Sequence, residues 1–382
     1  MSQDHSFSQS DLYQLKGPID FARGYYARAF RAYSWRRDRD VAFKVLRPEH
    51  LSPGSSGREY LAFGVETRLL HHFAENAGVV NLLDCGFISD RRELPRSGEI
   101  VNFDTDVEAF GARLQEFRER NWRPYLCEEL MPEDDSLFVS LRENAPGRPR
   151  RRLPTEEGIA LSWQYTELLQ QAHADDIVYL DAKPEHFYWN GEKLCIIDWN
   201  SSRMLCAADD PQDDPDHLKR EDIRNFVVGV MYVIFTGLSA QGHAVQESPS
   251  HRDAIAQRYQ VRTLDFGMEP SLPQSLIDLM QSATRGEYQD IKQFKQDLEE
   301  CAQECGWPPR SQRYRVTPPM RAREEMRKGL AALRQAQQKI QEARESFMEI
   351  EGDPEVAGSP LEVEAKRLTA LTNTFLKHRV IP

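Results

Sequence analysis

Two aspartates and a lysine stand close together in one stretch of the chain, and their spacing suits phosphoryl transfer. Asp181 and Asp198 end two short apolar runs, and Lys183 lies two residues after the first aspartate. One carboxylate can orient a hydroxyl nucleophile, the ammonium can neutralise a phosphoryl group in transit, and the second carboxylate can hold a divalent metal ion. These residues predict a catalytic centre, provided that the fold brings the two strand ends together.

The chain between these carboxylates has the pattern of a β-hairpin. Asn190 and Gly191 separate two short apolar runs, and Asn-Gly between such runs is a strong hairpin signal. A hairpin would place Asp181 and Asp198 near each other at one strand edge. Upstream, residues 156–176 predict an amphipathic helix, with one face made by Leu161, Tyr165, Leu168 and Ala172.

The wider pattern predicts an α+β chain. Residues 1–150 contain short runs rich in β-branched and aromatic residues, and residues 155–305 read as mostly helical. Residues 89–122 have the character of an insertion, part loop and part amphipathic helix. Residues 58–75 predict a helix with one apolar face made by Leu61, Val65, Leu69 and Phe73.

The opening stretch resembles the catalytic centre of the eukaryotic-like, bacterial-type Ser/Thr protein kinase superfamily. That family's catalytic loop is His-Arg-Asp-x-Lys-Pro-x-Asn, and residues 179–186 read Tyr-Leu-Asp-Ala-Lys-Pro-Glu-His. The family's metal motif is Asp-Phe-Gly, and residues 198–200 read Asp-Trp-Asn. The resemblance implies that Asp181 is the catalytic base, that Lys183 contacts the γ-phosphate of ATP, and that Asp198 binds Mg²⁺.

The first half of the chain carries further elements of the same resemblance. The run VAFKVL is similar to the strand whose lysine, here Lys44, would contact the α- and β-phosphates, and Glu66 would be its ion-pair partner. In the place of the glycine-rich loop, Gly24 is kept, and Ala22 and Ala27 stand at the other two glycine positions.

Two more elements complete the resemblance. The run PYLCEELMP is similar to the strand and hinge beside adenine, which implies that Glu129 to Met131 bind the base and that Glu128 is at the gatekeeper position. Asp222 begins a run similar to the buried helix that supports the catalytic loop. The resemblance covers residues 14–303 and implies a two-lobed protein-kinase-like fold, with a small β-rich N-lobe at 14–131 that includes the insertion at 89–122, and a mostly helical C-lobe at 132–307.

The departures from the family pattern bear on activity. His186 stands where the family has an asparagine that ligates the second metal ion, and imidazole suits softer metals better than Mg²⁺. Mn²⁺ is therefore an alternative cofactor, or His186 hydrogen-bonds phosphate or Asp198 instead. Tyr179 and Leu180 replace His-Arg, and a short acidic segment fills the place of the activation segment.

Three functions stay open at this level. The first is an ATP-dependent kinase acting on Ser/Thr hydroxyls. The second is a pseudokinase scaffold that works through protein contacts. The third is a small-molecule kinase of the same fold, since Ile-Asp-Trp at residues 197–199 resembles those families, although the Asp-x-Lys-Pro-Glu at residues 181–185 favours a protein kinase.

Composition narrows the range of partners and compartments. The 382 residues carry a formal net charge of −12, which disfavours a general nucleic-acid or anionic-membrane binder. The six cysteines form no CxxC pair, and no apolar run reaches the roughly 20 residues needed to span a bilayer. With no signal-peptide pattern at the N-terminus, we expect a cytoplasmic protein.

The C-terminal residues predict a helical hairpin joined by a linker. Residues 308–319 read as the linker, and residues 320–382 as the hairpin tail. Its first helix has a seven-residue repeat that is typical of a narrow coiled-coil seam, made by Met326, Leu333, Ile340 and Phe347. The hairpin either packs on its own chain, or forms a homodimer, or docks a protein partner.

Overall fold

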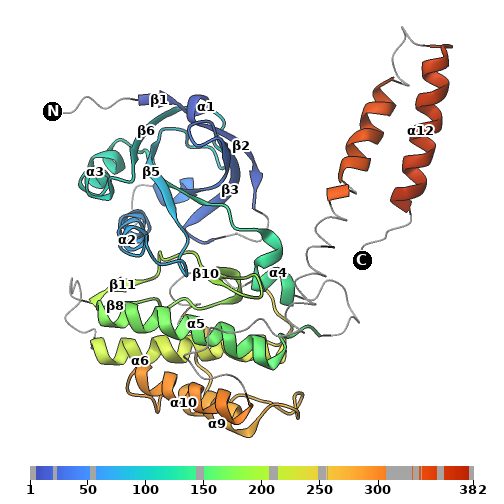
Figure 1. Ribbon diagram of the computed structural model, residues 1–382. Helices are drawn as coiled ribbons and strands as arrows, with labels where there is room; N and C mark the ends of the chain where they lie inside the picture. The colour runs from blue at the N-terminus through green and yellow to red at the C-terminus, as the bar shows by residue number, and fades with distance from the viewer. Residues whose placement is uncertain are drawn as a thin grey trace. The chain divides into compact units, whose positions relative to one another are not determined.

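A computed structural model gives the fold. It describes residues 6–19, 24–51, 57–142, 150–205, 214–247, 255, 257–306, 329, 335–336, 338–350 and 357–377. The chain divides into two compact units, Met1–Arg315 and Val316–Pro382. The chain is α+β, as the sequence predicts (Figure 1).

A curled antiparallel sheet dominates the first part of the first unit (Figure 1). Among the described residues it has seven strands, in the spatial order β1 (Ser6–Ser8), β6 (Glu99–Asp104), β5 (Leu82–Ile88), β7 (Arg123–Glu129), β4 (Arg39–Leu46), β3 (Ala27–Ser34) and β2 (Tyr13–Pro18). The short helix α1 (Gln9–Leu12) links β1 to β2. The sheet therefore begins upstream of residue 14, where the sequence resemblance begins.

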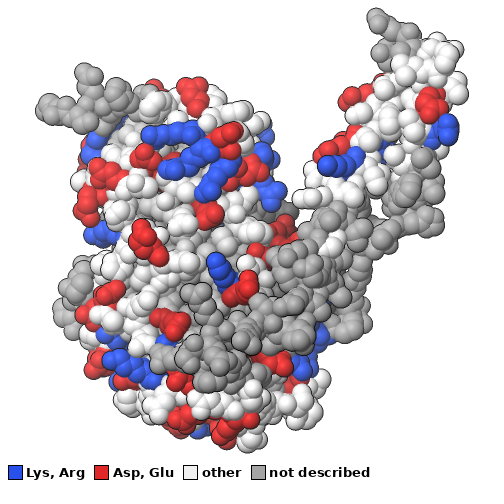
Figure 2. All heavy atoms as spheres, viewed as in Figure 1, with Lys and Arg blue, Asp and Glu red and all other residues white. Residues whose placement is uncertain are grey.

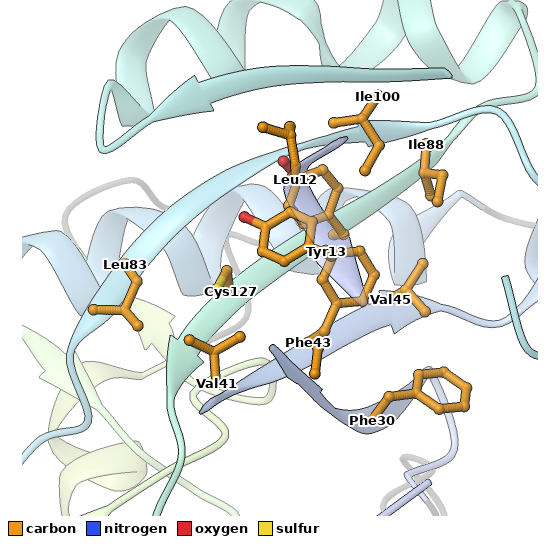
Figure 3. Packing of buried hydrophobic residues seen from close by; sticks show 12 residues of the cluster. Leu12, Tyr13, Phe30, Val41, Phe43, Val45, Leu83, Ile88, Ile100 and Cys127 are labelled. Atoms are coloured by element: carbon orange, nitrogen blue, oxygen red, sulfur yellow. The ribbon is translucent and has the colours of Figure 1, made fainter. Parts of the chain in front are cut away.

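The curl of the sheet encloses an apolar core. Val41, Phe43 and Val45 point inward from β4, because side chains on a strand alternate between its two faces. They meet inward residues of the other strands, including Tyr13 and Phe30, in the cluster shown in Figure 3. The same alternation sends Lys44 to the opposite face of the sheet.

The segment expected to be an insertion is part of the sheet. Strand β6 lies within residues 89–122 and pairs with both β5 and β1. The amphipathic helix expected within this segment is α3 (Val107–Glu119). The strand escaped prediction because charged loop residues surround its short apolar run, and because one of its partners, β1, is far away in the chain.

Helix α2 (Arg58–His72) packs against α3 and the sheet, and the face that the sequence predicts is buried in part: Leu69 and Phe73 are buried and Val65 is half-buried. Leu61 is 51% exposed. Residues four apart drift by about 40° around a helix at each step, so a strict fourfold series leaves the buried face. The residues that are buried are Tyr60, Phe63, Gly64, Glu66, Thr67, Leu69 and Leu70.

The second part of the first unit is mostly helical (Figure 1). Its helices are α4 (Leu137–Leu141), α5 (Thr155–Ala174), α6 (Pro215–Phe226), the π-helical segment Val227–Met231, α7 (Tyr232–Thr236), α9 (Gln274–Thr284) and α10 (Ile291–Glu304). Short 3₁₀ turns span Pro48–Leu51, Glu133–Asp135 and Pro184–His186. Helix α5 confirms the helix predicted at 156–176, and its predicted apolar face is buried.

The predicted β-hairpin is confirmed. Strands β9 (Phe187–Trp189) and β10 (Leu194–Ile196) pair antiparallel, and Gly191 in their turn has a φ of 91°. The side-chain oxygen of Asn190 accepts hydrogen bonds from the backbone N–H groups of Glu192 and Lys193, at 2.9 and 2.8 Å. A second short antiparallel pair is formed by β8 (Ile177–Val178), which precedes the hairpin in the chain, and β11 (Arg203–Met204), which follows it.

The second unit contains two helical segments, residues 338–350 and α12 (Pro360–Lys377). Arg344 Nε donates a hydrogen bond to Asn373 Oδ1 at 2.7 Å, which joins the two segments. The linker at 308–319 and the repeat positions Met326 and Leu333 lie outside the described residues.

The described surface carries side chains of both charges (Figure 2). Acidic and basic side chains intermix over the face of the first unit in Figure 2. Within the described ranges, no helix combines the length and apolar character needed to cross a bilayer.

Candidate functional site

A cavity of about 450 Å³ opens between the curled sheet and the segment around the β9–β10 hairpin. It gathers residues that the sequence singled out from distant parts of the chain. Those that line it are Gly24, Ala27, Lys44, Glu129, Met131, Lys183, His186 and Asp198. Ala22 lies outside the described residues.

Lys44 is the centre of a buried ion cluster at this cavity. Its Nζ donates to both carboxylate oxygens of Glu66, at 2.7 and 2.8 Å, and to Oδ1 of Asp198 at 2.8 Å. Glu66 comes from the buried face of α2 and is 0% exposed. Strand β4, helix α2 and the turn after β10 are thus joined at one ammonium group.

Burial and charge oppose each other in this cluster. Burial alone would lower the pKa of Lys44, but the carboxylates of Asp198 and Glu66 raise it above its usual value. Burial raises the pKa of Glu66, and the ammonium of Lys44 opposes that rise. For Asp198, burial acts to raise the pKa, but Lys44 and His186 hold it well below its usual range. Asp198 is therefore a carboxylate at neutral pH.

Asp198 has an unusual backbone conformation that turns its side chain toward this cluster. It follows β10 with a φ of 61°, in the left-handed region that non-glycine residues seldom adopt. The next residue, Trp199, donates its backbone N–H to Glu66 Oε1 at 3.0 Å. Such strain persists where surrounding contacts compensate it, and it is common at functional sites.

His186 connects the two aspartates. Its Nε2 lies 3.2 Å from Asp198 Oδ2, and its Nδ1 lies 3.0 Å from the backbone carbonyl of Asp181. Tyr179 fixes the ring from the other side, with its hydroxyl 3.1 Å from Nδ1, and donates to the carbonyl of Ile197 at 2.8 Å. The imidazole thus contacts Asp198 directly.

The loop that carries Asp181 is held by helix α6. The two carboxylate oxygens of Asp222 accept the backbone N–H groups of Tyr179 and Leu180, at 2.7 and 2.8 Å. Leu180 has a φ of 66°, a strained value for a residue with a bulky side chain. Charge-assisted hydrogen bonds are among the stronger ones, so Asp222 stabilises this conformation. His173 of α5 also lies within reach of Asp222, at 3.1 Å.

Asp181 is buried beside the cavity and does not itself line it. It is 1% exposed, and its Oδ2 lies 3.8 Å from Lys183 Nζ and 3.9 Å from His186 Nδ1. Arg258 donates from Nη1 to the other oxygen, Oδ1. Burial would raise the pKa of Asp181, but Lys183, His186 and Arg258 together lower it below its usual value.

Arg258 is a site residue that the sequence analysis missed. It lies far along the chain from Asp181, outside every motif, and no local pattern marks it. Its neighbour Tyr259 donates a hydrogen bond to the carbonyl of Ala182 at 2.9 Å, so this segment is tied to the Asp181 loop at two points.

Glu128 brings an acidic group into the wall of the cavity. It stands opposite Ala42 in the sheet, on the same face as Lys44, and is 5% exposed. Among the described residues, its buried Oε1 has no hydrogen-bond partner. Burial raises the pKa of Glu128, while Lys44 lowers it. Glu128 therefore places a carboxyl group in the cavity wall on the same face of the sheet as Lys44.

Asp198 and His186 of this cavity could contribute ligands to a metal ion. Among those described, no group of three or more His, Cys, Asp or Glu side chains is arranged to hold a metal ion. A Mg²⁺ ion bound to a nucleotide needs only one or two carboxylates, because phosphate oxygens and waters fill its other positions. The Asp198 carboxylate fits that need, and the His186 imidazole is a weaker match for so hard an ion.

No protein-family model matches the chain, and no curated protein matches its sequence.

Proposed function

We propose that this protein is an ATP- and Mg²⁺-dependent phosphotransferase with a two-lobed protein-kinase-like fold. In this proposal the curled sheet is the small lobe and the helical part of the first unit is the large lobe. The observation that carries it is the bond of one buried lysine, Lys44, to Glu66 of α2 and to Asp198 after β10. An ammonium group held in this way stands ready for the phosphates of a nucleotide.

Each residue of the cavity then has a role that its chemistry supports. Glu129 and Met131 flank the place for adenine, and Gly24 and Ala27 cover the phosphates. Lys44 binds the α- and β-phosphates, because its ammonium already faces the cavity. Asp198 would hold Mg²⁺, which, when bound, neutralises charge on the phosphates.

Phosphoryl transfer needs an oriented hydroxyl and a cation at the transferring group. Asp181 is the base that accepts the hydrogen bond of the acceptor hydroxyl, and its lowered pKa keeps it ionised for that role. Lys183 lies 3.8 Å from that carboxylate and lines the cavity, so it can contact the γ-phosphate. The acceptor is a Ser or Thr hydroxyl of a protein.

A pseudokinase scaffold is the second candidate, because two observations favour it. Asp181 is 1% exposed and paired with Arg258, and Glu128 adds a carboxylate to the cavity that must accept an anion. Both features would weaken nucleotide binding or acceptor access. In that case the protein would act through protein contacts, including those of its C-terminal helices.

The deciding experiment measures phosphate transfer from γ-labelled ATP by the purified protein, with Mg²⁺ and separately with Mn²⁺. The Asp181→Asn variant is the control, because it keeps the shape of the side chain and loses the base. We expect label on the protein or on an added protein, with at least a hundredfold loss in the variant. Added sugars, choline and aminoglycosides test for a small-molecule acceptor in the same assay.

Transfer that is absent with both metals would overturn the proposal. Thermal stabilisation by ATP without transfer would then support the scaffold.

A further inference from the structure

We propose that Arg258 is a positioning residue for the catalytic carboxylate: it holds one oxygen of Asp181 so that the other accepts the acceptor's hydroxyl. This inference rests on the proposed function and identifies where the acceptor sits.

The contact between Arg258 and the Asp181 loop is built into the fold. Arg258 donates from Nη1 to Asp181 Oδ1, and the same Nη1 lies 3.2 Å from the hydroxyl of Tyr259. That hydroxyl donates to the backbone carbonyl of Ala182, next to the aspartate. The guanidinium also lies 5.4 Å from the centre of the Tyr259 ring. Tyr259 therefore fixes the arginine and the loop together.

The two oxygens of Asp181 are in different environments. Oδ1 is taken by Arg258, whereas Oδ2 is buried and, among the described residues, has no hydrogen-bond partner. A buried acceptor without a partner is costly, so this oxygen would gain from a donor. Lys183 and His186, the residues nearest to it, both line the cavity. The acceptor hydroxyl therefore approaches Oδ2 from the side of Lys183 and His186.

The arginine also affects the charge of the base. An aspartate accepts the hydroxyl's hydrogen bond only while it is ionised, and Arg258 is among the cations that lower its pKa. The charged and titratable groups around Asp181 come from several elements: Lys183 and His186 of its own loop, Tyr179 before it, Asp198 after β10, Tyr26 near β3, and Arg258 with Tyr259. Removing one cation from this set raises the pKa of Asp181.

The test compares Arg258→Gln and Arg258→Lys with the unchanged protein. Steady-state transfer from ATP is measured between pH 5 and 9, and Arg262→Gln is the matched control, since Arg262 is exposed and four residues away. We expect Arg258→Gln to lower kcat about ten- to a hundredfold, because a misplaced base loses orientation, while KM for ATP changes less than about twofold. Its acid limb should move to higher pH. Arg258→Lys keeps the charge and should recover part of kcat and the original acid limb.

Several results would overturn the inference. A kcat and acid limb in Arg258→Gln that match the unchanged protein would leave the proposed function standing and remove the role of Arg258. A higher kcat in this variant would show that the arginine obstructs the acceptor. If circular dichroism shows that Arg258→Gln does not fold, Arg258→Lys decides. This variant keeps the positive charge, so an acid limb that still moves to higher pH would contradict the proposal.

Failure of the proposed function itself gives a different result. The unchanged protein would then transfer no phosphate, and a double-mutant cycle of Arg258→Gln with Asp181→Asn in thermal unfolding would measure the ion pair alone. If the cycle shows coupling between the two residues but the protein transfers no phosphate, the ion pair has a structural role only. That result would also rule out the positioning role of Arg258.

Discussion

At the scale of single residues, negative charge gathers around Lys44 beside the cavity. Glu66, Glu128 and Asp198 surround Lys44, and all act on its pKa. Two of these carboxylates bond to the lysine directly, but Glu128 does not share those bonds. Its charge is therefore the least compensated of the three, and an approaching phosphate group is repelled by it.

This charge leads to a prediction for Glu128→Gln, which keeps the shape of the side chain and removes its charge. We expect ATP to bind about three- to tenfold more tightly, since one unit charge about 4 Å away is worth about 1 kcal/mol even when water screens it fully. Because burial raises the pKa of Glu128, protonation already removes part of its charge at low pH. The gain should therefore grow as the pH rises.

Isothermal titration calorimetry with ATP at pH 6 and pH 8 measures the effect. Glu108→Gln, an exposed change on α3, is the control. Equal or weaker ATP binding by Glu128→Gln at pH 8 would show that the carboxylate is not directed at the nucleotide.

At the scale of elements, the loop of Asp181 is held between helices. Asp222 of α6 binds two of its backbone N–H groups, and Asn225 of the same helix donates to the carbonyl of Leu180 at 3.0 Å. One turn further, the π-helical segment Val227–Met231 brings Gly229 against the loop. A Cβ at Gly229 would lie 2.0 Å from the carbonyl oxygen of Ala182. Only a residue without a side chain permits this approach.

Gly229→Ala should therefore disturb both stability and catalysis. The clash is with backbone, which cannot rotate away, so we expect the free energy of unfolding to fall by about 2–3 kcal/mol. Transfer should fall more than that loss explains, because the Asp181 loop itself must move. Urea unfolding and the labelled-ATP assay measure the two effects.

The matched control is Gly111→Ala on α3, where an added Cβ has no atom within 4 Å. It should stabilise the protein by about 0.5–1 kcal/mol, the ordinary gain from glycine to alanine in a helix. Similar behaviour of the two variants would mean that the Gly229 contact does not constrain the loop.

At the scale of the whole molecule, the core and the candidate site belong to the first unit. The curled sheet, the cavity and every described residue around Asp181 lie before Arg315, and the two C-terminal helical segments form a unit of their own. A chain that ends at Arg315 should therefore fold, bind ATP and transfer phosphate as the full chain does. Thermal unfolding with and without ATP, and the labelled-ATP assay, measure this.

A truncated chain that unfolds or loses transfer would show that the C-terminal unit supports the catalytic one. Light scattering on both chains adds the oligomeric state. A full chain that is dimeric and a truncated chain that is monomeric would place self-association in the C-terminal helices, one of the roles that the sequence left open.

The sequence by itself predicts the local features of the structure. The β9–β10 hairpin follows from Asn190-Gly191, and α5 follows from its apolar period, because both depend on residues a few positions apart. The residues singled out for chemistry, such as Lys44 and Asp198, do lie at one cavity. Predicting that they lie together required the order of the motifs along the chain, and not only the local pattern of each motif.

Only the tertiary structure decided the features that join distant segments. The burial of Glu66 in α2, the pairing of β6 with β1, and the bond from Arg258 to Asp181 have no local signal. Each depends on which surfaces meet after the chain has closed long loops, and this is set by packing and by the burial of charge. Sequence periodicity reports the shape of one segment, whereas the partners of Asp181 are a property of the assembled fold.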